Sequence, residues 1–143
     1  MTMPPGEYYI GDLCYVLDDR WNEVCDATIV EKTCLDGEHA LKDGALFAMY
    51  GTAHGDGEYL DDDGNAYPVD SGSIGCIDLM HLPEYYREKR DKIDSDGGLG
   101  HVRVFDSSFN TGCVDGVIVF GRVRIDTDPE YEADEDEDYP DED

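Results

Sequence analysis

Apolar and polar residues alternate along several short stretches of this chain, and such alternation predicts half-buried strands. Residues 100–105 alternate valines with His101 and Arg103, and residues 117–125 carry a valine, glycine or isoleucine at every second position. Residues 74–79 are rich in apolar and β-branched side chains and predict another strand. The pattern therefore favours many short strands.

Two pairs of such stretches are separated by residues that favour turns, which predicts β-hairpins. The turns are Lys42-Asp43-Gly44 and Asp61-Asp62-Asp63-Gly64-Asn65. The predicted strands are residues 38–41 with 45–53, and residues 57–60 with 66–69. Pro68 has no backbone N–H to donate to a neighbouring strand, so the second hairpin should end at a sheet edge.

The remaining periodic stretches predict one interrupted strand and two helices. Residues 7–17 are rich in aromatic and β-branched side chains and predict a strand that Gly11 interrupts. Residues 20–27 place apolar residues at the spacing of one helical face. Residues 84–92 pair acidic with basic residues three and four positions apart, which favours a polar surface helix.

Together these elements predict a mainly β, α+β protein. We expect a single curled antiparallel sheet or a small barrel of about eight short strands, with two short helices. A sharp change of composition near Asp126 divides the chain into a β-rich globular domain, residues 1–127, and an acidic C-terminal arm, residues 128–143.

Charge narrows the range of partners. The 143 residues hold 36 acidic and 10 basic side chains, and the formal net charge is −26. Residues 128–143 hold 11 acids and no base, whereas residues 1–127 hold 25 acids and 10 bases. So few cations argue against direct binding of nucleic acid or of an anionic membrane, and the charge favours a basic protein surface, in particular that of a nucleic-acid-binding protein.

The sharpest feature is a row of seven acidic residues at every second position from Asp126 to Asp138. In an extended chain these carboxylates would lie about 6.6 Å apart along one edge, facing water or a basic partner. An acidic turn at residues 61–63 adds to the acidic surface. The predicted partner-binding residues are Asp126, Asp128, Glu130, Tyr131, Glu132, Asp134, Asp136 and Asp138, with Asp61, Asp62 and Asp63.

Two stretches resemble a family of small uncharacterised proteins met in phages, plasmids and mobile islands. They are Gly11-Asp12-Leu13-Cys14-Tyr15-Val16, and Tyr50-Gly51-Thr52-Ala53-His54-Gly55-Asp56-Gly57 continuing to Asp70-Ser71-Gly72-Ser73-Ile74-Gly75. The resemblance covers roughly residues 6–82 and implies no established activity and no site residue. It does suggest one class of function, because small acidic phage proteins often imitate DNA in charge.

Our leading hypothesis is a non-enzymatic acidic binding protein, a phage or mobile-element DNA mimic that inhibits a host defence protein such as a restriction or CRISPR effector. The alternative is an acidic structural or housekeeping β-domain of a halophilic virus or host, because an acidic, lysine-poor surface also suits a salty cytoplasm. The first residues have no basic region followed by an apolar stretch, so we expect a protein of the host cytoplasm.

The sequence gives less support to a catalytic or a metal-binding function. The acids around Gly64 do not fit the EF-hand spacing, which leaves only an irregular calcium loop as an option. The four histidines and five cysteines have no zinc-ligand spacing. No catalytic residue, metal or cofactor is predicted, and an enzyme or a calcium-binding protein is the third hypothesis.

Overall fold

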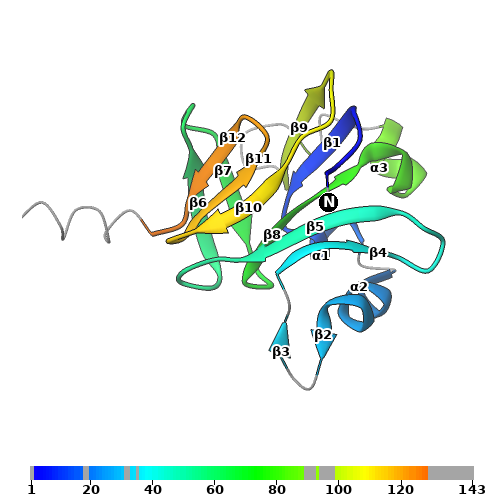
Figure 1. The fold of residues 1–143 in the computed structure, drawn as a ribbon, viewed down its shortest axis with the longest axis horizontal. Helices are drawn as coiled ribbons and strands as arrows, with labels where there is room; N and C mark the ends of the chain where they lie inside the picture. The colour runs from blue at the N-terminus through cyan, green and yellow to red at the C-terminus, as the bar shows by residue number, and fades with distance from the viewer. Residues whose placement is uncertain are drawn as a thin grey trace, which may run out of the picture.

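The computed structural model describes residues 2–17, 20–30, 33–34, 36–88, 93 and 99–128. Within these ranges the chain is mainly β, and ten strands form two five-stranded antiparallel sheets (Figure 1). The first sheet has the order β4 (Gly37–Ala40), β5 (Leu46–Gly51), β8 (Ser73–Asp78), β1 (Gly6–Gly11), β9 (Gly100–Phe105). The second has the order β10 (Thr111–Val114), β11 (Val117–Phe120), β12 (Val123–Asp126), β6 (Gly57–Asp61), β7 (Ala66–Val69).

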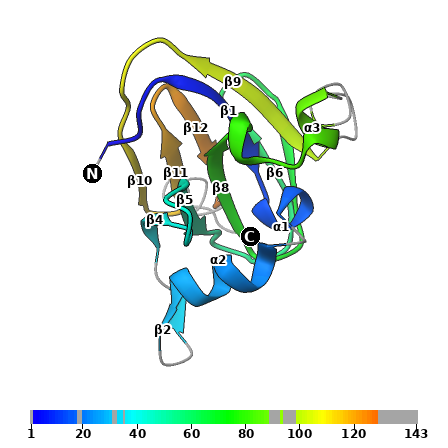
Figure 2. The same ribbon diagram turned by 90° about the vertical axis from the view of Figure 1, so that its right-hand side faces the viewer.

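Short helices and a small hairpin complete the described fold. The α-helices are α1 (Leu13–Val16), α2 (Trp21–Thr28) and α3 (Glu84–Glu88), and η2 (Leu79–His81) is a 3₁₀ turn. The β2 (Ile29–Val30) and β3 (Thr33–Cys34) pair projects past α2, away from both larger sheets (Figure 2). In the described part of the chain, no helix has the length and apolar character needed to cross a membrane.

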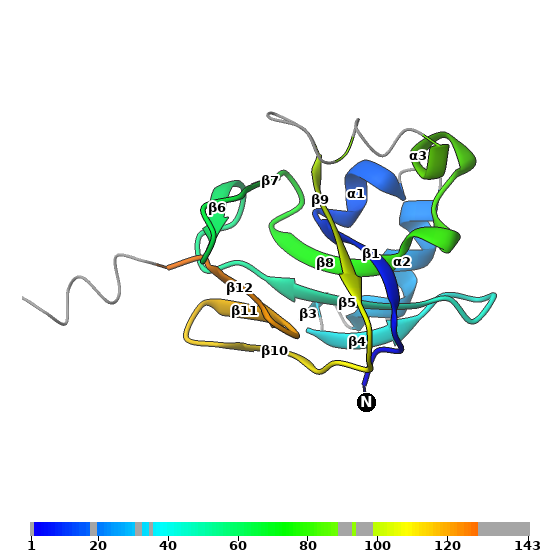
Figure 3. The same cartoon turned by 90° about the horizontal axis from the view of Figure 1, so that it is seen from above.

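The first sheet is the middle layer of three. One face packs Tyr8, Ile10 and Cys76 against the second sheet, and the opposite face packs Tyr9 and Ile77 beneath the helices. Figure 3 shows α1 and α3 on the side of β8 and β1 that lies away from β10 and β11. Because both faces are covered, these central strands are continuously buried and do not alternate.

The second sheet is covered on one face only. In β11 and β12 the buried residues Ile118, Phe120, Val123 and Ile125 face the first sheet. The residues between them point away from that core, as the period of two along a strand requires. This sheet therefore has an outer face that no other described element covers.

Side chains join the two sheets along both pairs of edges. At one edge the Tyr50 hydroxyl and the Thr111 hydroxyl lie 2.7 Å apart, and Thr111 also donates to the Glu38 carboxylate. At the other, the His101 ring nitrogen lies 2.9 Å from the Ala66 carbonyl oxygen. The expectation of one curled sheet or a small barrel was wrong in this respect, because side chains and not strand ladders bridge the edges of the described sheets.

The mainly β prediction is confirmed, as are the two hairpins, the helix near residues 20–27 and the edge position of the Pro68 strand. The strand expected over residues 7–17 is different: it ends at Gly11, and the Asp12 side chain accepts the Cys14 N–H and caps α1. This adds a third helix to the two predicted. The predicted helix at residues 84–92 is observed as α3, and residues 89–92 lie outside the described ranges.

The strand expected over residues 117–125 is broken into β11 and β12 by a tight turn at residues 121–122. Gly121 adopts φ +61°, a conformation that an L residue rarely takes. The two-residue turn reverses which positions face the core, so Val117 and Val119 point outward whereas Val123 and Ile125 point inward. The described residues form twelve strands, more than the eight expected, partly for this reason.

Candidate acidic binding surface

The acidic turn between β6 and β7 begins with a carboxylate that serves the fold. Asp61 Oδ1 accepts the backbone N–H groups of Asp63 and Asn65, both at 2.9 Å, and Oδ2 accepts the Tyr67 hydroxyl at 2.7 Å. The Arg103 guanidinium lies 3.7 Å away, and the Asp61 side chain is only 4% exposed. Burial acts to raise the pKa of Asp61, but these hydrogen bonds outweigh it and hold the pKa below its usual value.

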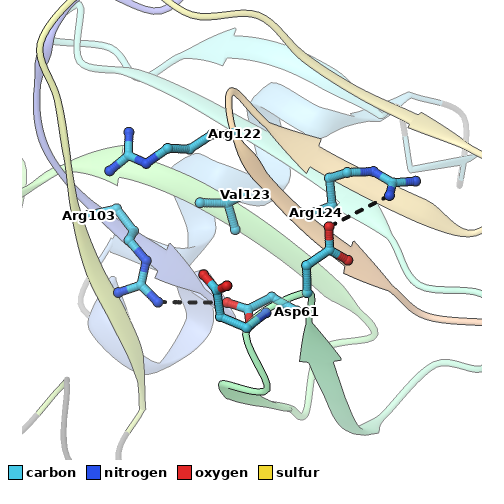
Figure 4. A pocket seen from close by; sticks show the side chains of 7 residues that line it. Asp61, Arg103, Arg122, Val123 and Arg124 are labelled. Atoms are coloured by element: carbon cyan, nitrogen blue, oxygen red, sulfur yellow. Dashed lines mark hydrogen bonds and ion pairs between the residues drawn. The ribbon is translucent and has the colours of Figure 1, made fainter.

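The turn also borders a small pocket of about 90 Å³ where arginines from both five-stranded sheets gather (Figure 4). Its lining consists of three aspartates, three arginines and a valine: Asp61, Asp62, Asp63, Arg103, Arg122, Val123 and Arg124. Arg103 and Arg124 reach the turn from opposite sides, and Arg124 lies 3.6 Å from the Asp62 carboxylate. Two of the three predicted carboxylates therefore already face an arginine within the molecule, although Asp62, like Asp63, is exposed.

The start of the acidic row lies close to this turn, at the end of β12. Asp126 is the last residue of that strand, paired with Val117 on one side and Leu60 on the other. Its carboxylate accepts the Asp128 N–H at 2.9 Å. The register therefore places Asp126 one position from Asp61 on the neighbouring strand, with the two side chains on opposite faces of the sheet.

Thr127 and Asp128 fasten the beginning of the acidic row to the body. Thr127 is 0% exposed; its N–H and its hydroxyl both donate to the Gly116 carbonyl oxygen, at 2.8 and 2.5 Å. The same hydroxyl accepts the Ala53 N–H at 3.0 Å. The Asp128 carboxylate lies 2.9 Å from the His54 ring, and this contact is an ion pair when His54 is protonated.

Most of the predicted row lies outside the described residues. The predicted partner-binding residues that lie outside the described ranges are Glu130, Tyr131, Glu132, Asp134, Asp136 and Asp138. The hypothesis that the row prolongs the last strand is correct for Asp126 and wrong for the two residues that follow, because β12 ends at Asp126 and the chain bends at Thr127.

The two stretches behind the family resemblance meet in space through Asp12. This carboxylate, 0% exposed, accepts the N–H groups of Asp70 and Ser71 at 2.7 Å each, the Ser71 hydroxyl at 2.8 Å and the Cys14 N–H at 3.0 Å. Asp12 was not among the predicted site residues. Its position after a glycine and before an apolar run is typical of a helix cap, which was the available signal.

Two of the cysteine side chains, those of Cys14 and Cys76, are held in the protonated form. Burial, with a hydrogen bond to Asp12, raises the pKa of the Cys14 thiol to about 12. Burial also raises the pKa of the Cys76 thiol far above neutrality. Since the thiolate is the reactive species, these thiols act as packing groups at neutral pH.

Among the described residues, no group of three histidine, cysteine, aspartate or glutamate side chains converges on a common point where a metal ion could bind. At the turn the reason is visible, because the Asp61 carboxylate points toward Tyr67 and the Asp62 carboxylate toward Arg124. An irregular calcium loop at residues 61–65 therefore gains no support from the geometry.

Comparisons with protein-family models, with curated proteins and with solved structures found no match to this chain. The resemblance to a phage and plasmid family thus stays a hypothesis. What the fold and the site define is a class: a mainly β protein of three layers, with an acidic segment fastened to the end of a central strand.

Proposed function

We propose that this protein is a non-enzymatic acidic binding protein that occupies the basic nucleic-acid-binding surface of another protein. In its sharpest form the proposal is a DNA mimic that inhibits a restriction or CRISPR effector. The formal charge of −26 supports a basic partner, and 11 of the acids belong to residues 128–143.

The main observation in support of the proposal is that the first residues of the acidic row are bonded to the body of the protein. Thr127 is buried and bonded to Gly116 and Ala53, and Asp128 contacts His54. These contacts fix the point on the body from which the acidic segment continues. Charges that start from a fixed place on the body can bind a partner in one orientation. A tail that only increases solubility does not need such a fixed attachment.

The charge density agrees with a partial imitation of DNA. Duplex DNA carries one phosphate per about 3.4 Å along each strand. Carboxylates at every second residue of an extended chain lie about 6.6 Å apart and supply about half that density. The remaining charge would come from acids of the body and from Glu135 and Glu137, which lie between members of the row.

A competition experiment tests the proposal. The full chain is added to a panel of purified restriction endonucleases and CRISPR effector complexes, and DNA binding is followed by gel shift at increasing NaCl. We expect at least one enzyme to lose DNA binding at low salt, with inhibition weakening steeply as salt rises. If every enzyme retains its DNA at all salt concentrations, the mimic proposal is wrong.

Two full-length variants of equal charge locate the effect. The first neutralises the arm by Glu130→Gln, Glu132→Gln, Asp134→Asn, Asp136→Asn and Asp138→Asn. The second neutralises five exposed residues of the body by Asp26→Asn, Asp56→Asn, Glu84→Gln, Glu88→Gln and Asp106→Asn. Both have a formal charge five units less negative than the native chain. We expect the arm variant to lose at least tenfold in inhibition and the body variant to lose little; equal losses would indicate a non-specific charge effect.

A further inference from the structure

The outer face of the second sheet carries a row of mostly apolar side chains. The strand register places Val114 opposite Val117, Val117 opposite Asp126, Asp126 opposite Leu60, and Leu60 opposite Ala66. One residue from each of the five strands thus forms a continuous row, and a single carboxylate, that of Asp126, stands at its centre. Val119 and Pro68 flank the row on the same face.

Two residues of this row are open to solvent, and the other three are partly exposed. Val114 is 71% exposed and Leu60 is 54% exposed, and both rank among the large apolar residues that the fold leaves uncovered. The helices lie on the far side of the first sheet (Figure 3). Scattered apolar residues on a surface need no explanation, but a row across a whole sheet is typical of an interaction site.

The charges on this face that are not paired with an opposite charge are negative. Arg124 is exposed on it but lies 3.6 Å from Asp62, so this pair is close to neutral. Glu58 and Asp126 remain, and the row from Asp126 leaves the sheet from its central strand. An occupant of this face therefore meets an apolar centre with negative charge around and within it.

Net charge decides between a second copy of this chain and a different protein. Face-to-face pairing of two copies would bring together two molecules of formal charge −26 and place their Asp126 carboxylates near each other. Like charges opposed across an interface are strongly unfavourable. The occupant that matches both the apolar row and its charge is a surface that combines apolar side chains with lysine or arginine.

The dimensions of the row indicate which secondary structure of a partner would fit it. Five strands about 4.8 Å apart span about 19 Å, and four residues along a strand span about 13 Å. An α-helix of about 14 residues is about 21 Å long and about 10 Å wide, so one helix covers the row. The face, roughly 250 Å² by these spacings, is well below the 800 Å² or so that each partner buries in a stable complex. A stable complex therefore needs contacts outside this row as well.

We propose that the outer face of the second sheet, centred on Leu60, Val117 and Asp126, docks a basic amphipathic helix of the partner protein. The proposal rests on the proposed function, because it takes the partner to be basic. It adds that recognition has an apolar part, located on the sheet and separable from the electrostatic part located in the acidic segment.

The test uses two synthetic probe peptides of 14 residues with the same number of lysines. One is an amphipathic helix of leucine and lysine, and in the other serine replaces every leucine. Binding of each to the full chain is measured by fluorescence anisotropy at 0.15 M NaCl, and backbone amide shifts locate the contact by NMR. We expect the leucine–lysine peptide to bind at least tenfold more tightly and to shift amides of β6, β11 and β12.

Matched variants assign the apolar contribution. The double variant Leu60→Ser, Val117→Ser removes apolar side chains on both sides of Asp126, and Met80→Ser removes one that is 67% exposed elsewhere, in η2. We expect the double variant to weaken the leucine–lysine peptide at least tenfold and to leave the serine–lysine peptide unchanged. Met80→Ser should change neither.

The outcomes separate the two proposals. If neither peptide binds, the chain does not recognise basic surfaces and the proposed function fails. If both bind equally, or if the double variant binds the leucine–lysine peptide as the native chain does, the docking face is wrong while the acidic binding function stands. A native dimer in sedimentation equilibrium that the double variant abolishes would show that a second copy occupies the face, which also overturns this inference.

Discussion

Asp61 illustrates how a residue in an acidic run can serve the fold before it serves a partner. Its carboxylate satisfies the N–H groups of Asp63 and Asn65, the Asn65 side chain and the Tyr67 hydroxyl, and it lies near Arg103. These contacts hold the β6–β7 turn closed and join it to β9. We therefore assign Asp61 to the structure of the turn and leave Asp63, which is exposed, as the turn residue open to a partner.

Replacing Asp61 with asparagine tests this assignment. Asparagine keeps the shape of the side chain, but its NH₂ group cannot accept the Tyr67 hydroxyl or the Asn65 amide, and its charge no longer attracts Arg103. Hydrogen bonds to a charged group contribute about 1.5–3 kcal/mol each, so we expect Asp61→Asn to lower the free energy of unfolding by about 2–3 kcal/mol. Urea denaturation at pH 7 measures this. Asp63→Asn is the control and should leave stability unchanged; equal effects at the two sites would contradict the assignment.

The lowered pKa of Asp61 gives this difference a pH dependence. The carboxyl has an unfolded pKa of about 3.9 and a lower one in the folded state. Its contribution to stability is therefore fully present above about pH 5 and is lost as the pH falls through the folded pKa. We expect the native chain and Asp61→Asn to converge in stability as the pH falls from about 5 through the folded pKa of this carboxyl. A constant difference across that range would show that the carboxylate charge is not the cause.

At the level of elements, Asp12 joins two segments that are distant in the sequence. The Asp12 carboxylate caps α1 through Cys14 and binds the turn that precedes β8 through Asp70 and Ser71. The Tyr9 hydroxyl donates to the carbonyl oxygens of Asp12 and Leu99 and fixes the same corner. The end of β1 and the start of β8 are therefore held by one buried carboxylate.

Graded substitutions test this junction. Ser71→Ala removes one of the four hydrogen bonds to Asp12 and should cost about 1 kcal/mol of unfolding free energy. Asp12→Ala leaves four donors without their acceptor and should cost about 3 kcal/mol or more. Chemical denaturation with urea gives both values. Ser107→Ala, in an exposed loop, should have no effect, and an Asp12→Ala variant as stable as Ser71→Ala would contradict this role.

The turn between β11 and β12 depends on Gly121. Its φ of +61° disfavours an L side chain, and a Cβ there would lie 2.8 Å from a Phe105 ring carbon. Gly121→Ala should cost about 2 kcal/mol or more in the free energy of unfolding, from the left-handed backbone and the contact together. Thermal and urea unfolding measure this cost.

Gly112 provides the matched control in the neighbouring strand. A Cβ at Gly112 would meet no atom within 4 Å, so Gly112→Ala should be neutral or stabilise by up to about 1 kcal/mol. If Gly121→Ala is as stable as Gly112→Ala, the turn accommodates a side chain and the break in the predicted strand has another cause.

These elements also show what sequence can predict. The β6–β7 hairpin follows from its own turn residues, Asp61 to Asn65, whose hydrogen bonds are local. The cap of α1 is also local, through the Cys14 N–H, but the aromatic and β-branched residues around it favoured a strand. The bonds from Asp12 to Asp70 and Ser71 could not be predicted, because these partners lie 58 and 59 residues further along the chain. The alternation through Gly121 predicted one strand, although the chain turns there. A two-residue turn keeps an apolar residue at every second position of the sequence, but these residues face outward in β11 and inward in β12.

At the level of the whole molecule, two surfaces of different origin adjoin at β12. The acidic row from Asp126 was evident from sequence because its period of two is explicit in the chain. The apolar row across the second sheet was not, since Val114, Val117, Leu60 and Ala66 come from four strands and become neighbours only through register. Similarly, the pairing of Asp61 and Asp62 with arginines from other strands could not be derived from the acidic turn alone.

Salt dependence distinguishes a binding surface from adaptation to a salty cytoplasm. A formal charge of −26 destabilises the compact state by self-repulsion, and the screening length falls from about 30 Å at 0.01 M salt to about 8 Å at 0.15 M. The core between the sheets and beneath the helices is apolar and needs no salt to form.

We therefore expect a folded protein at 0.01 M NaCl whose melting temperature rises by about 4–8 °C on going to 0.15 M, for a relief of about 1–2 kcal/mol of repulsion. Above about 0.5 M the gain should level off, because the exposed charges are then screened from one another. Circular dichroism melts over this range give the curve. The arm-neutralised variant should already show part of the gain at 0.01 M. A native chain that is unfolded at 0.15 M and folds only in molar salt would instead establish the halophilic alternative, in which acidity serves hydration and no basic partner is required.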